Sequence, residues 1–447
     1  MQDKHGLLSA PIPKVLRQMT IPMIFGMISI LMFNLVDTFF ISLLGTQALA
    51  SISYTFPVTF ALNCITMGMG VGLSTNIAHL LGQKKTIGAT RFATHGLLLT
   101  VVLITLASGI GLMTIQPIFS LLGASPELIP AIDEYMHIWY LSIPLLAIPM
   151  IGNSVIRATG DTRTPATIMV LAGVINGVLD PLLIFGWGPF PELGIQGAAI
   201  ASALSWLGAC LWSLYILTQR EPMLAPPHLS CIVEDCKQIL RIATPAALSN
   251  SMIPLSGALL MIIMSRHGTA AVAAYGAAQR IESILILVLM SLASALTPFI
   301  AQNLGAEKHK RSFTGLFISM RFALVFQMGV FIAMVPLSIP IASLFSQEQS
   351  VKELLWHYLL VVPFSYGFQG IAMILVSGLN ALHQPLKAFQ WSFMRLFLFT
   401  LPSAWLGSYW FGTKGIFVGI ALGNIIVGVL GYLYALKLRR KYLHQTI

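Results

Sequence analysis

Long apolar runs, separated by short polar breaks, follow one another along nearly the whole chain. Each run is long enough for the roughly 20-residue helix that crosses a membrane. The pattern therefore predicts an all-α integral membrane protein with twelve transmembrane helices. We place these helices at residues 15–44, 52–82, 92–119, 134–158, 164–187, 194–218, 239–265, 270–304, 313–344, 354–380, 386–410 and 414–437.

The second half of the chain repeats the first half. A shift of 223 positions (from 22 to 245) carries Pro22 onto Pro245 and also carries Gly45 onto Gly268. Near the end of each half, Pro165 meets Pro385 at a shift of 220 (from 165 to 385). Repeats that lie six spans apart keep the same orientation in the membrane. The two halves are therefore predicted to be six-helix bundles related as a parallel repeat, by an axis along the membrane normal.

The longest polar break lies at the midpoint of the chain. It reads REPMLAPPHLSCIVEDCK over residues 220–237 and is rich in proline and charge. Such a composition is typical of a loop. We therefore expect an N-terminal six-helix bundle in residues 1–219, a cytoplasmic linker in residues 220–237 and a C-terminal six-helix bundle in residues 238–447.

Composition and charge agree with a membrane protein. Hydrophobic residues make up 56% of the chain and charged residues only 9%, whereas soluble domains have about 25% charged residues. The net charge of +10 suggests topology rather than nucleic-acid binding, because Lys and Arg cluster at every second loop and at both chain ends. This positive-inside pattern predicts that both termini are cytoplasmic.

Carboxylates at membrane depth are the strongest functional candidates. Asp37 lies in the first apolar run and Asp180 in the fifth, where a charge costs roughly 3 kcal/mol on insertion scales. Two neighbouring carboxylates favour the uptake of a proton, and hard oxygen ligands also suit a small hard cation such as sodium. The first-half candidates are the two acids with four neutral ligands: Asp37, Asn176, Asp180, Asn34, Asn153 and Ser202.

Each polar residue of this set has a structural alternative, in which it hydrogen-bonds a neighbouring helix. We favour that alternative for Asn153 and Ser202, and disfavour it for the acids because of their cost. The repeat supports this distinction, since Asp37 maps onto Leu260 and the pair Asn176 and Asp180 maps onto Leu396 and Thr400. The second half thus folds without these acids.

Two charged residues of the eighth span are secondary candidates. Arg280 and Glu282 lie within the apolar run of residues 270–304. For this pair a structural or gating role is favoured over ion coupling. No cofactor or metal site is predicted, because the GMGVG run at residues 68–72 lacks the Lys-Ser/Thr of a phosphate loop and the histidines show no ligand spacing. Because no ATP-binding motif is found, an active transporter with this sequence would be driven by an ion gradient.

Several motifs resemble those of the multidrug and toxic compound extrusion (MATE) family, in its DinF-like branch. They are NLVDTFFISLLGTQALA in the first span, GLSTNIAHLLGQKK at the end of the second, RATGDTRTP after the fourth, and NGVLDPLLI with GIQGAAIAS beyond it. The resemblance covers essentially the whole chain. It implies a V-shaped pair of bundles that exports cationic, lipophilic compounds by antiport.

The resemblance also assigns roles to individual residues. Asp37, Asn176 and Asp180 match the cation site of the first half, and Pro22 matches the proline at which the first helix bends. Asn153 matches a polar position of the fourth span. Ser202 stands where a threonine is common and keeps the hydroxyl group. The relatives of the NorM-type branch carry further acids in the second half, of which this sequence has only Glu282.

We therefore expect a monomeric multidrug efflux antiporter in the bacterial inner membrane, surrounded by lipid and driven by protons, with sodium as the alternative coupling ion. Two other functions remain open. A lipid-linked oligosaccharide flippase would need basic residues for pyrophosphate, and Arg395 and Arg280 are the deep arginines of the second half. A membrane-embedded transferase would need a catalytic cluster, and none is found.

Overall fold

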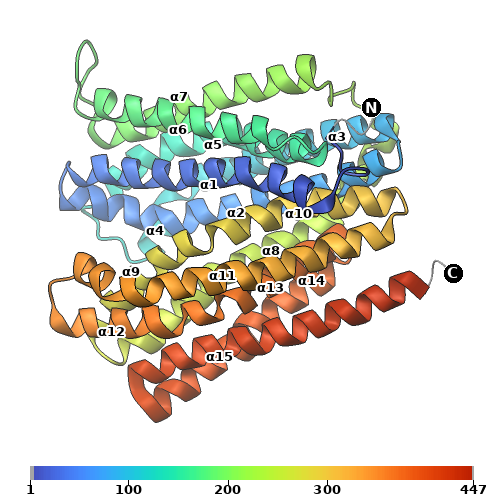
Figure 1. Ribbon diagram of the computed structural model, residues 1–447. Helices are drawn as coiled ribbons and strands as arrows, with labels where there is room; N and C mark the ends of the chain where they lie inside the picture. Colours follow the sequence, from blue (N-terminus) through green and yellow to red (C-terminus); the bar gives the residue numbers. More distant parts are fainter. Residues whose placement is uncertain (1–4, 445–447) are drawn as a thin grey trace. The chain divides into compact units, whose positions relative to one another are not determined.

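The computed structural model describes residues 5–444, and every regular element in that range is a helix (Figure 1). The helices of the first half alternate with short turns and pack around α5. This helix contacts α2, α3, α4, α6 and α7. The bounds are α1 Ile12–Ser42, α2 Thr46–Gly82, α3 Thr86–Met113, α4 Ile115–Leu121, α5 Ile129–Ala158, α6 Arg163–Ile184 and α7 Gly194–Tyr215, which continues as a π-helical turn over Ile216–Arg220.

The second half repeats this arrangement around α13, which contacts α10, α11, α14 and α15. Its elements are α8 Ile232–Ser265, α9 Thr269–Leu285, α10 Leu287–Gly305, α11 His309–Phe345, α12 Gln349–Val361, α13 Tyr366–Ala381, α14 Pro385–Phe393, the π-helical segment Met394–Thr400 and α15 Leu401–His444. Short 3₁₀ turns lie at Leu229–Cys231 and Pro363–Ser365.

Turn conformations confirm the repeat at the level of the backbone. Three turns place a residue in the left-handed region, where side chains other than glycine are unfavourable. Each recurs in the other half at the shift of 223 positions. The pairs are Gly45 (φ 110°) with Gly268 (98°), Lys84 (62°) with Glu307 (58°), and Gly160 (99°) with His383 (56°).

The predicted spans lie on the observed helices, but several contain more than one element: residues 92–119 are divided between α3 and α4, residues 354–380 between α12 and α13, and residues 386–410 run over α14, the π-helical segment and α15. The span expected at 270–304 is made of two helices, α9 and α10, which meet at Ile286. The last two predicted spans lie in one segment, Pro385–Leu443, which is the last of eleven segments of the described chain that are long and apolar enough to cross a membrane. Inside it, Gly412 leaves the helical conformation (φ 61°, ψ −143°).

Close glycine contacts show that the chain reverses at Gly412. A Cβ atom built on Gly407 would overlap the carbonyl oxygen of Gly415, and one built on Gly415 would overlap the carbonyl oxygen of Gly407. Further from the turn, Gly419 packs in the same way against Ser403. The two arms therefore run side by side, separated by backbone alone, as small residues allow in membrane helices. Counting these arms separately gives the twelve predicted crossings.

The chain divides into two compact units. Unit 1 comprises Ile21–Ala247, and unit 2 comprises Gly6–Thr20 together with the chain from Leu248 onward. The divisions lie beside Pro22 in α1 and Pro245 in α8, the two prolines that the repeat places on each other. The sequence had placed the boundary within residues 220–237. The observed division differs because that segment and the start of α8 pack with unit 1.

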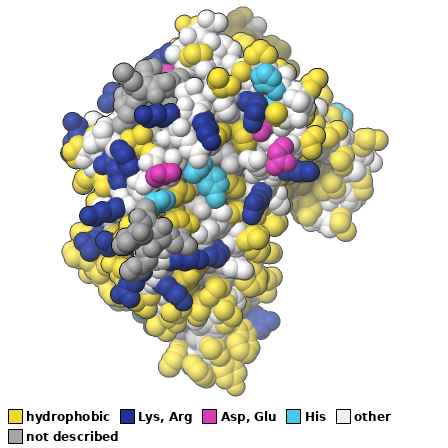
Figure 2. Space-filling model, turned by 90° about the vertical axis from the view of Figure 1, so that its right-hand side faces the viewer, with side chains coloured by type: hydrophobic (Ala, Val, Ile, Leu, Met, Phe, Trp, Pro, Cys, Tyr) yellow, Lys and Arg dark blue, Asp and Glu magenta, His cyan; other side chains and the backbone are white. Residues whose placement is uncertain are grey.

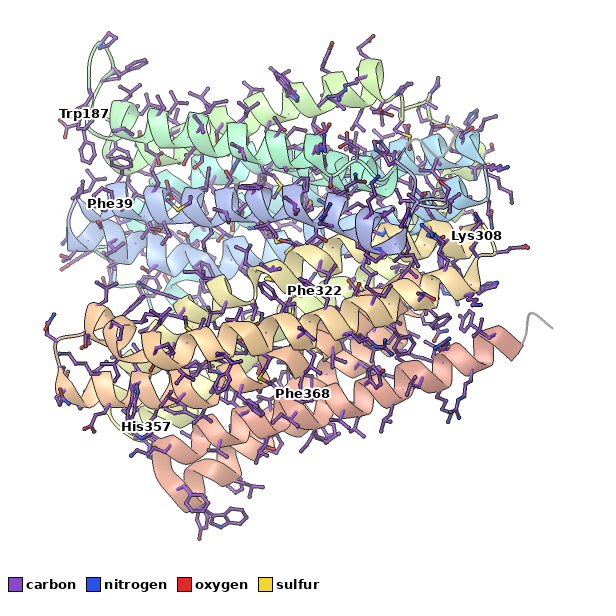
Figure 3. All side chains as sticks on the ribbon, in the orientation of Figure 1. Phe39, Trp187, Lys308, Phe322, His357 and Phe368 are labelled. Atoms are coloured by element: carbon purple, nitrogen blue, oxygen red, sulfur yellow. The ribbon has the colours of Figure 1, made fainter. Side chains whose placement is uncertain are left out.

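Each unit has its own apolar core. In unit 1 it gathers around Trp139 and Tyr140 of α5, and in unit 2 around Tyr358 and Tyr366. The aromatic residues Phe39 and Trp187 lie at one end of the unit 1 helices (Figure 3). In unit 2, Lys308 and His357 lie at opposite ends of the helices in the same view. The face seen in Figure 2 gathers Lys and Arg side chains, as the positive-inside pattern predicts for a cytoplasmic face.

The N-terminal segment is held on unit 2 by side chains of α10 and α11. The Leu7 carbonyl accepts hydrogen bonds from Asn303 Nδ2 (3.1 Å) and Arg311 Nε (3.2 Å). Lys308 Nζ donates to the carbonyl of Leu8 at 2.9 Å. These bonds satisfy backbone oxygens that no helix would pair, because the segment precedes α1.

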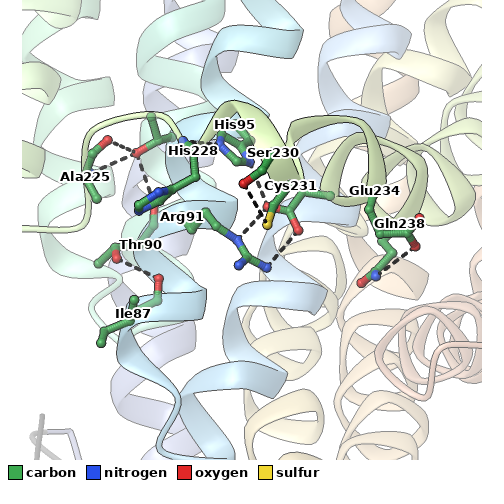
Figure 4. A network of polar contacts seen from close by, with 12 residues as sticks. Ile87, Thr90, Arg91, His95, Ala225, His228, Ser230, Cys231, Glu234 and Gln238 are labelled. Carbon is green, nitrogen blue, oxygen red and sulfur yellow. Dashed lines mark hydrogen bonds and ion pairs between the residues drawn. The ribbon is translucent and has the colours of Figure 1, made fainter.

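The central linker is held on unit 1 by a buried ionic cluster (Figure 4). Asp235 accepts two hydrogen bonds from the Arg91 guanidinium (2.8 and 3.0 Å) and one from His95 Nδ1 (2.7 Å). The backbone N–H of His228 donates to His95 Nε2 at 3.1 Å, so the imidazole proton lies on Nδ1. The hydroxyl of Thr94 adds bonds to both the carbonyl and the N–H of Ala225. The linker is thus an ordered strap across α3.

We predict that Asp235→Asn loosens this strap. The change removes the negative charge that Arg91 pairs with and turns one of the two accepting oxygens into an N–H donor, which must then face a donor of Arg91 or His95. Losing two charge-assisted bonds lowers the local opening free energy by roughly 2 kcal/mol or more. Limited trypsin digestion of the purified protein should therefore cleave at Lys237, which lies beside the cluster, at least ~10-fold faster.

The neighbouring acid Glu234 provides the matched control. It is exposed and accepts one bond from Gln238 Nε2 at 3.2 Å. Glu234→Gln should leave the cleavage rate at the parental value. Equal cleavage of the Asp235→Asn variant and the parent would show that the ionic cluster does not hold the linker.

Candidate functional site

The site lies inside unit 1, where α6 and α7 face each other. Asn176 and Asp180 are one helical turn apart on α6, and the Asn176 amide Nδ2 donates to Asp180 Oδ1 at 3.2 Å. The same nitrogen donates to Ser202 Oγ of α7 at 3.3 Å. All three side chains are buried. The helices approach this closely because Gly197 packs directly on the backbone at Leu183.

Asp37 of α1 belongs to the same electrostatic environment. Val36, its neighbour in α1, lies against Gly177, the neighbour of Asn176 in α6, which places the Asp37 carboxylate on the side of α6 that carries the site. Asp37 Oδ1, Asp180 Oδ2 and Asn176 Oδ1 are buried oxygens that no described residue supplies with a hydrogen bond. That the site's two carboxylates and its amide each carry such an oxygen is notable, because a buried polar atom without a partner is unfavourable. They mark a place suited to an added proton or cation.

Tyr135 is a site residue that the sequence analysis missed. It is a buried residue of α5, and the charges of both Asp37 and Asp180 act on its hydroxyl. The repeat contained a signal for it, because the shift of 223 positions places Tyr135 on Tyr358. In unit 2 the hydroxyl of Tyr358 donates to a carboxylate, that of Glu282, at 2.9 Å. Each unit thus has this tyrosine in the environment of an acid, and in unit 2 the two are hydrogen-bonded.

The structure does not bring Asn34 into the cluster. Its side chain is exposed, and its amide donates to the carbonyl of Ile30 in the same helix at 3.0 Å. Asn153 is buried in α5, and its Oδ1 has no donor among the described residues. No bond joins it to the three hydrogen-bonded residues. Pro22 lies inside a continuous α1, beside the division between the units.

The chemistry of the donor set fits a proton or a small hard cation. Two carboxylates and an amide oxygen are hard ligands. No Lys, Arg or His of the described chain lies within 4 Å of either carboxylate to neutralise it. The described residues include no cluster of three or more His, Cys, Asp or Glu side chains with the geometry of a metal site. The oxygen donors therefore suit a proton or a monovalent cation.

In unit 2 the secondary candidates have different environments. Arg280 is exposed, whereas Glu282 is half-buried and has both carboxylate oxygens bonded. Tyr358 donates to one of them, and Gln369 Nε2 donates to the other at 3.3 Å. The Arg395 charge also acts on Glu282. Unit 2 thus contains a polar centre of its own, which the comparison of Asp37 with Leu260 did not predict.

Comparison with known proteins gives the same division of the chain. A model of the MatE family matches two stretches, residues 22–182 and 245–406. They begin at Pro22 and Pro245, which are again 223 positions apart (from 22 to 245). The match covers both units and contains Asp37 and Asp180 in its first stretch and Glu282 and Arg395 in its second.

Individual relatives span nearly the full length. The chain is 47% identical over 440 residues to a Shewanella oneidensis protein named FAD transporter, with 98% of this chain and 97% of the relative covered. It is 25% identical to the multidrug export protein MepA of Staphylococcus aureus, with 98% and 96% covered. Among solved structures, the Vibrio cholerae MATE transporter VcmN in its bent form superposes with a TM-score of 0.93 at 32% identity, over 96% of this chain and 98% of that one.

Proposed function

Since the chain belongs to the MatE family of membrane transporters, we propose that it exports a flavin dinucleotide, FAD, in exchange for protons. The observation that carries this proposal is the 47% identity to the FAD transporter, which extends over 98% of this chain. Identity over 98% of the chain includes the polar centres of both units. It favours a shared substrate more strongly than the 25% identity to a multidrug exporter.

The coupling step uses the acids of unit 1. Asp37 takes a proton from outside, because a neutral carboxyl relieves the repulsion from Asp180 and the burial of charge. The protonated carboxyl has a donor to offer, so it can pair with one of the unsatisfied oxygens of Asn176 or Asp180. The new bond draws α1 to a different position on α6. The proton therefore binds more tightly when α1 is in the new position, and this difference in affinity couples proton uptake to transport.

Pro22 provides the place where α1 can bend. A proline inside a helix removes one backbone hydrogen bond and weakens the helix there. It lies where α1 passes from one unit to the other. A solved relative at 32% identity is described in a bent form, which supports bending as part of the cycle.

The proposed location is the bacterial inner membrane, with both termini cytoplasmic.

Multidrug efflux is the second candidate. Relatives named for multidrug export or resistance match most of the chain, at 25% identity for MepA and 28% for YoeA of Bacillus subtilis. The uncompensated carboxylates of unit 1 would also attract a cationic drug. Both candidates use the same fold and the same ion gradient. They differ in the charge of the substrate, since FAD is anionic.

Liposomes containing the purified protein separate these functions. Vesicles loaded with FAD and placed in more acidic buffer should release FAD, followed by its fluorescence outside. Release of ethidium but not of FAD would replace the first candidate with the second. Efflux driven by a sodium gradient at equal pH, and not by a proton gradient, would overturn the choice of coupling ion.

A further inference from the structure

The repeat relates the helix of unit 1 that carries Asp180 to the helix of unit 2 that carries Arg395. The shift of 220 positions carries Val174–Asp180 of α6 onto the π-helical segment Met394–Thr400. The unit 1 segment contains the acid Asp180, which the shift places on Thr400. The unit 2 segment contains no acid and carries Arg395 instead. Tyr135 and Tyr358 occupy equivalent positions beside the two centres. The second unit has therefore exchanged an acidic centre for one that contains an arginine.

Arg395 has donors that no described residue uses. Its side chain is half-buried, and no hydrogen bond or ion pair within 4 Å joins its guanidinium group to the described chain. The backbone around it departs from the α-helix, and the Thr400 hydroxyl donates to the Arg395 carbonyl at 2.7 Å. Short π-helical segments inside α-helices occur frequently at functional sites.

Arg395 lies within the last long apolar segment of the described chain, Pro385–Leu443. It lies ten residues after Pro385 (from 385 to 395), which is about 15 Å along the helix at 1.5 Å per residue. The hydrocarbon core of a bilayer is about 30 Å thick, so Arg395 lies inside a segment long and apolar enough to cross it. An ionisable residue within such a segment is expensive and usually marks a substrate pathway.

Glu282 belongs to the same polar centre, because its partner Gln369 bonds Asn424, and Gly423 beside Asn424 packs on the backbone of Thr400 in the π-helical segment of Arg395. Its two oxygens accept bonds from Tyr358 and Gln369. Gln369 is in turn bonded through its Oε1 to Asn424 Nδ2 at 3.5 Å, and Asn424 donates to Ser365 Oγ at 3.0 Å. The Glu282 carboxylate is thus fixed by neutral donors. The Arg395 guanidinium remains available for another acceptor, within the field of the Glu282 charge.

We propose that Arg395 binds the phosphate groups of the exported substrate, and that Glu282 weakens this binding enough for release. The inference rests on the proposed function and specifies which part of the flavin dinucleotide is recognised. A guanidinium presents a planar fork of donors that matches phosphate oxygens. In a low-dielectric site the attraction alone would be strong. A fixed carboxylate near the guanidinium opposes the incoming anion and keeps binding reversible.

The test compares three flavins that differ in phosphate content. FAD carries a diphosphate, FMN one phosphate and riboflavin none. We expect Arg395→Gln to weaken the binding of FAD and FMN roughly 10- to 100-fold, the effect of losing a charge-assisted contact. Binding of riboflavin should stay within about 2-fold, since it makes no such contact. Flavin fluorescence quenching by the detergent-purified, full-length protein gives each affinity.

Arg321 of α11 is the matched control for loss of charge. It is an exposed arginine of the same unit. Arg321→Gln should leave all three affinities unchanged. Glu282→Gln keeps the length of the side chain but removes its negative charge, so FAD should bind about 3- to 10-fold more tightly and turn over more slowly in liposomes. Arg395→Lys, which keeps the charge without the fork, should give an intermediate FAD affinity and covers the case in which Arg395→Gln does not fold.

Three outcomes would overturn the proposal. One is unchanged FAD affinity in folded Arg395→Gln, and another is an equal loss for riboflavin. The third is a lipid effect: if Arg395→Gln lowers FAD affinity in micelles that contain anionic phosphatidylglycerol but not in micelles without it, the arginine acts through a bound lipid phosphate instead. Failure of the parent to bind or transport any flavin would instead remove the proposed function itself, so the two failures are distinguishable.

Discussion

Asp37→Asn should abolish proton-driven export while the protein still inserts and folds. The amide has nearly the same volume as the acid but cannot exchange a proton, so the coupling step has no carrier. Asn also resembles the protonated acid in being neutral, so the binding of FAD should survive. We expect gradient-driven FAD release from liposomes to fall to the level of protein-free vesicles. FAD binding should remain within about 3-fold of the parent, because Asp37 is assigned to proton coupling and the exchange removes no contact with FAD.

Leu260→Met provides the control for this variant. Leu260 is the repeat equivalent of Asp37 in unit 2, and it packs in the apolar core there. A leucine-to-methionine exchange nearly conserves volume and usually costs less than about 1.5 kcal/mol. Transport should therefore continue at the parental rate. Parental transport in Asp37→Asn, or loss of both transport and binding, would contradict the assignment of Asp37 to coupling.

Gly415→Ala should prevent the last two crossings from packing. The added methyl group would overlap the carbonyl of Gly407 and side-chain atoms of Phe411. Backbone atoms cannot move aside as a flexible side chain does, so the two arms must separate. Ordinary overpacking costs 1–3 kcal/mol, and a clash with backbone should exceed about 3 kcal/mol. We expect a large loss of monodisperse protein after detergent extraction and a lower unfolding temperature in the fraction that remains.

Gly329 of α11 is the control for a glycine-to-alanine exchange. No atom lies within 4 Å of a Cβ built at this position. Alanine has the higher helix propensity, by about 1 kcal/mol, so Gly329→Ala should be neutral or slightly stabilising. A Gly415→Ala variant as stable as the Gly329→Ala variant would show that the two arms are not packed backbone to backbone.

Fold class, number of crossings and repeat could be predicted from the sequence because each depends on local properties. A run of about 20 apolar residues must form a helix in lipid, where every backbone group needs a partner. The shift that relates Pro22 to Pro245 follows from residue identities alone. The two acids were recognisable for a similar reason, since a charge within such a run is costly wherever the helix packs.

The division between the units depended on contacts that no local pattern contains. Residues 220–237 have the composition of a free linker, yet Asp235 is buried against Arg91 and His95. Which charged residues of a loop find partners depends on the helix beside which the loop lies. The same holds for residues 6–20, which pack with unit 2.

The sequence by itself thus determined which residues cross the membrane, how the halves correspond and that Asp37 and Asp180 needed an explanation. The tertiary structure decided which polar residues meet. Helical periodicity gives the face on which Asn34 and Asn176 lie, but only packing shows that Asn34 bonds its own helix while Asn176 bonds Asp180 and Ser202. It also revealed the unpaired donors of Arg395, because a side chain's partners are set by neighbouring helices that are distant in sequence.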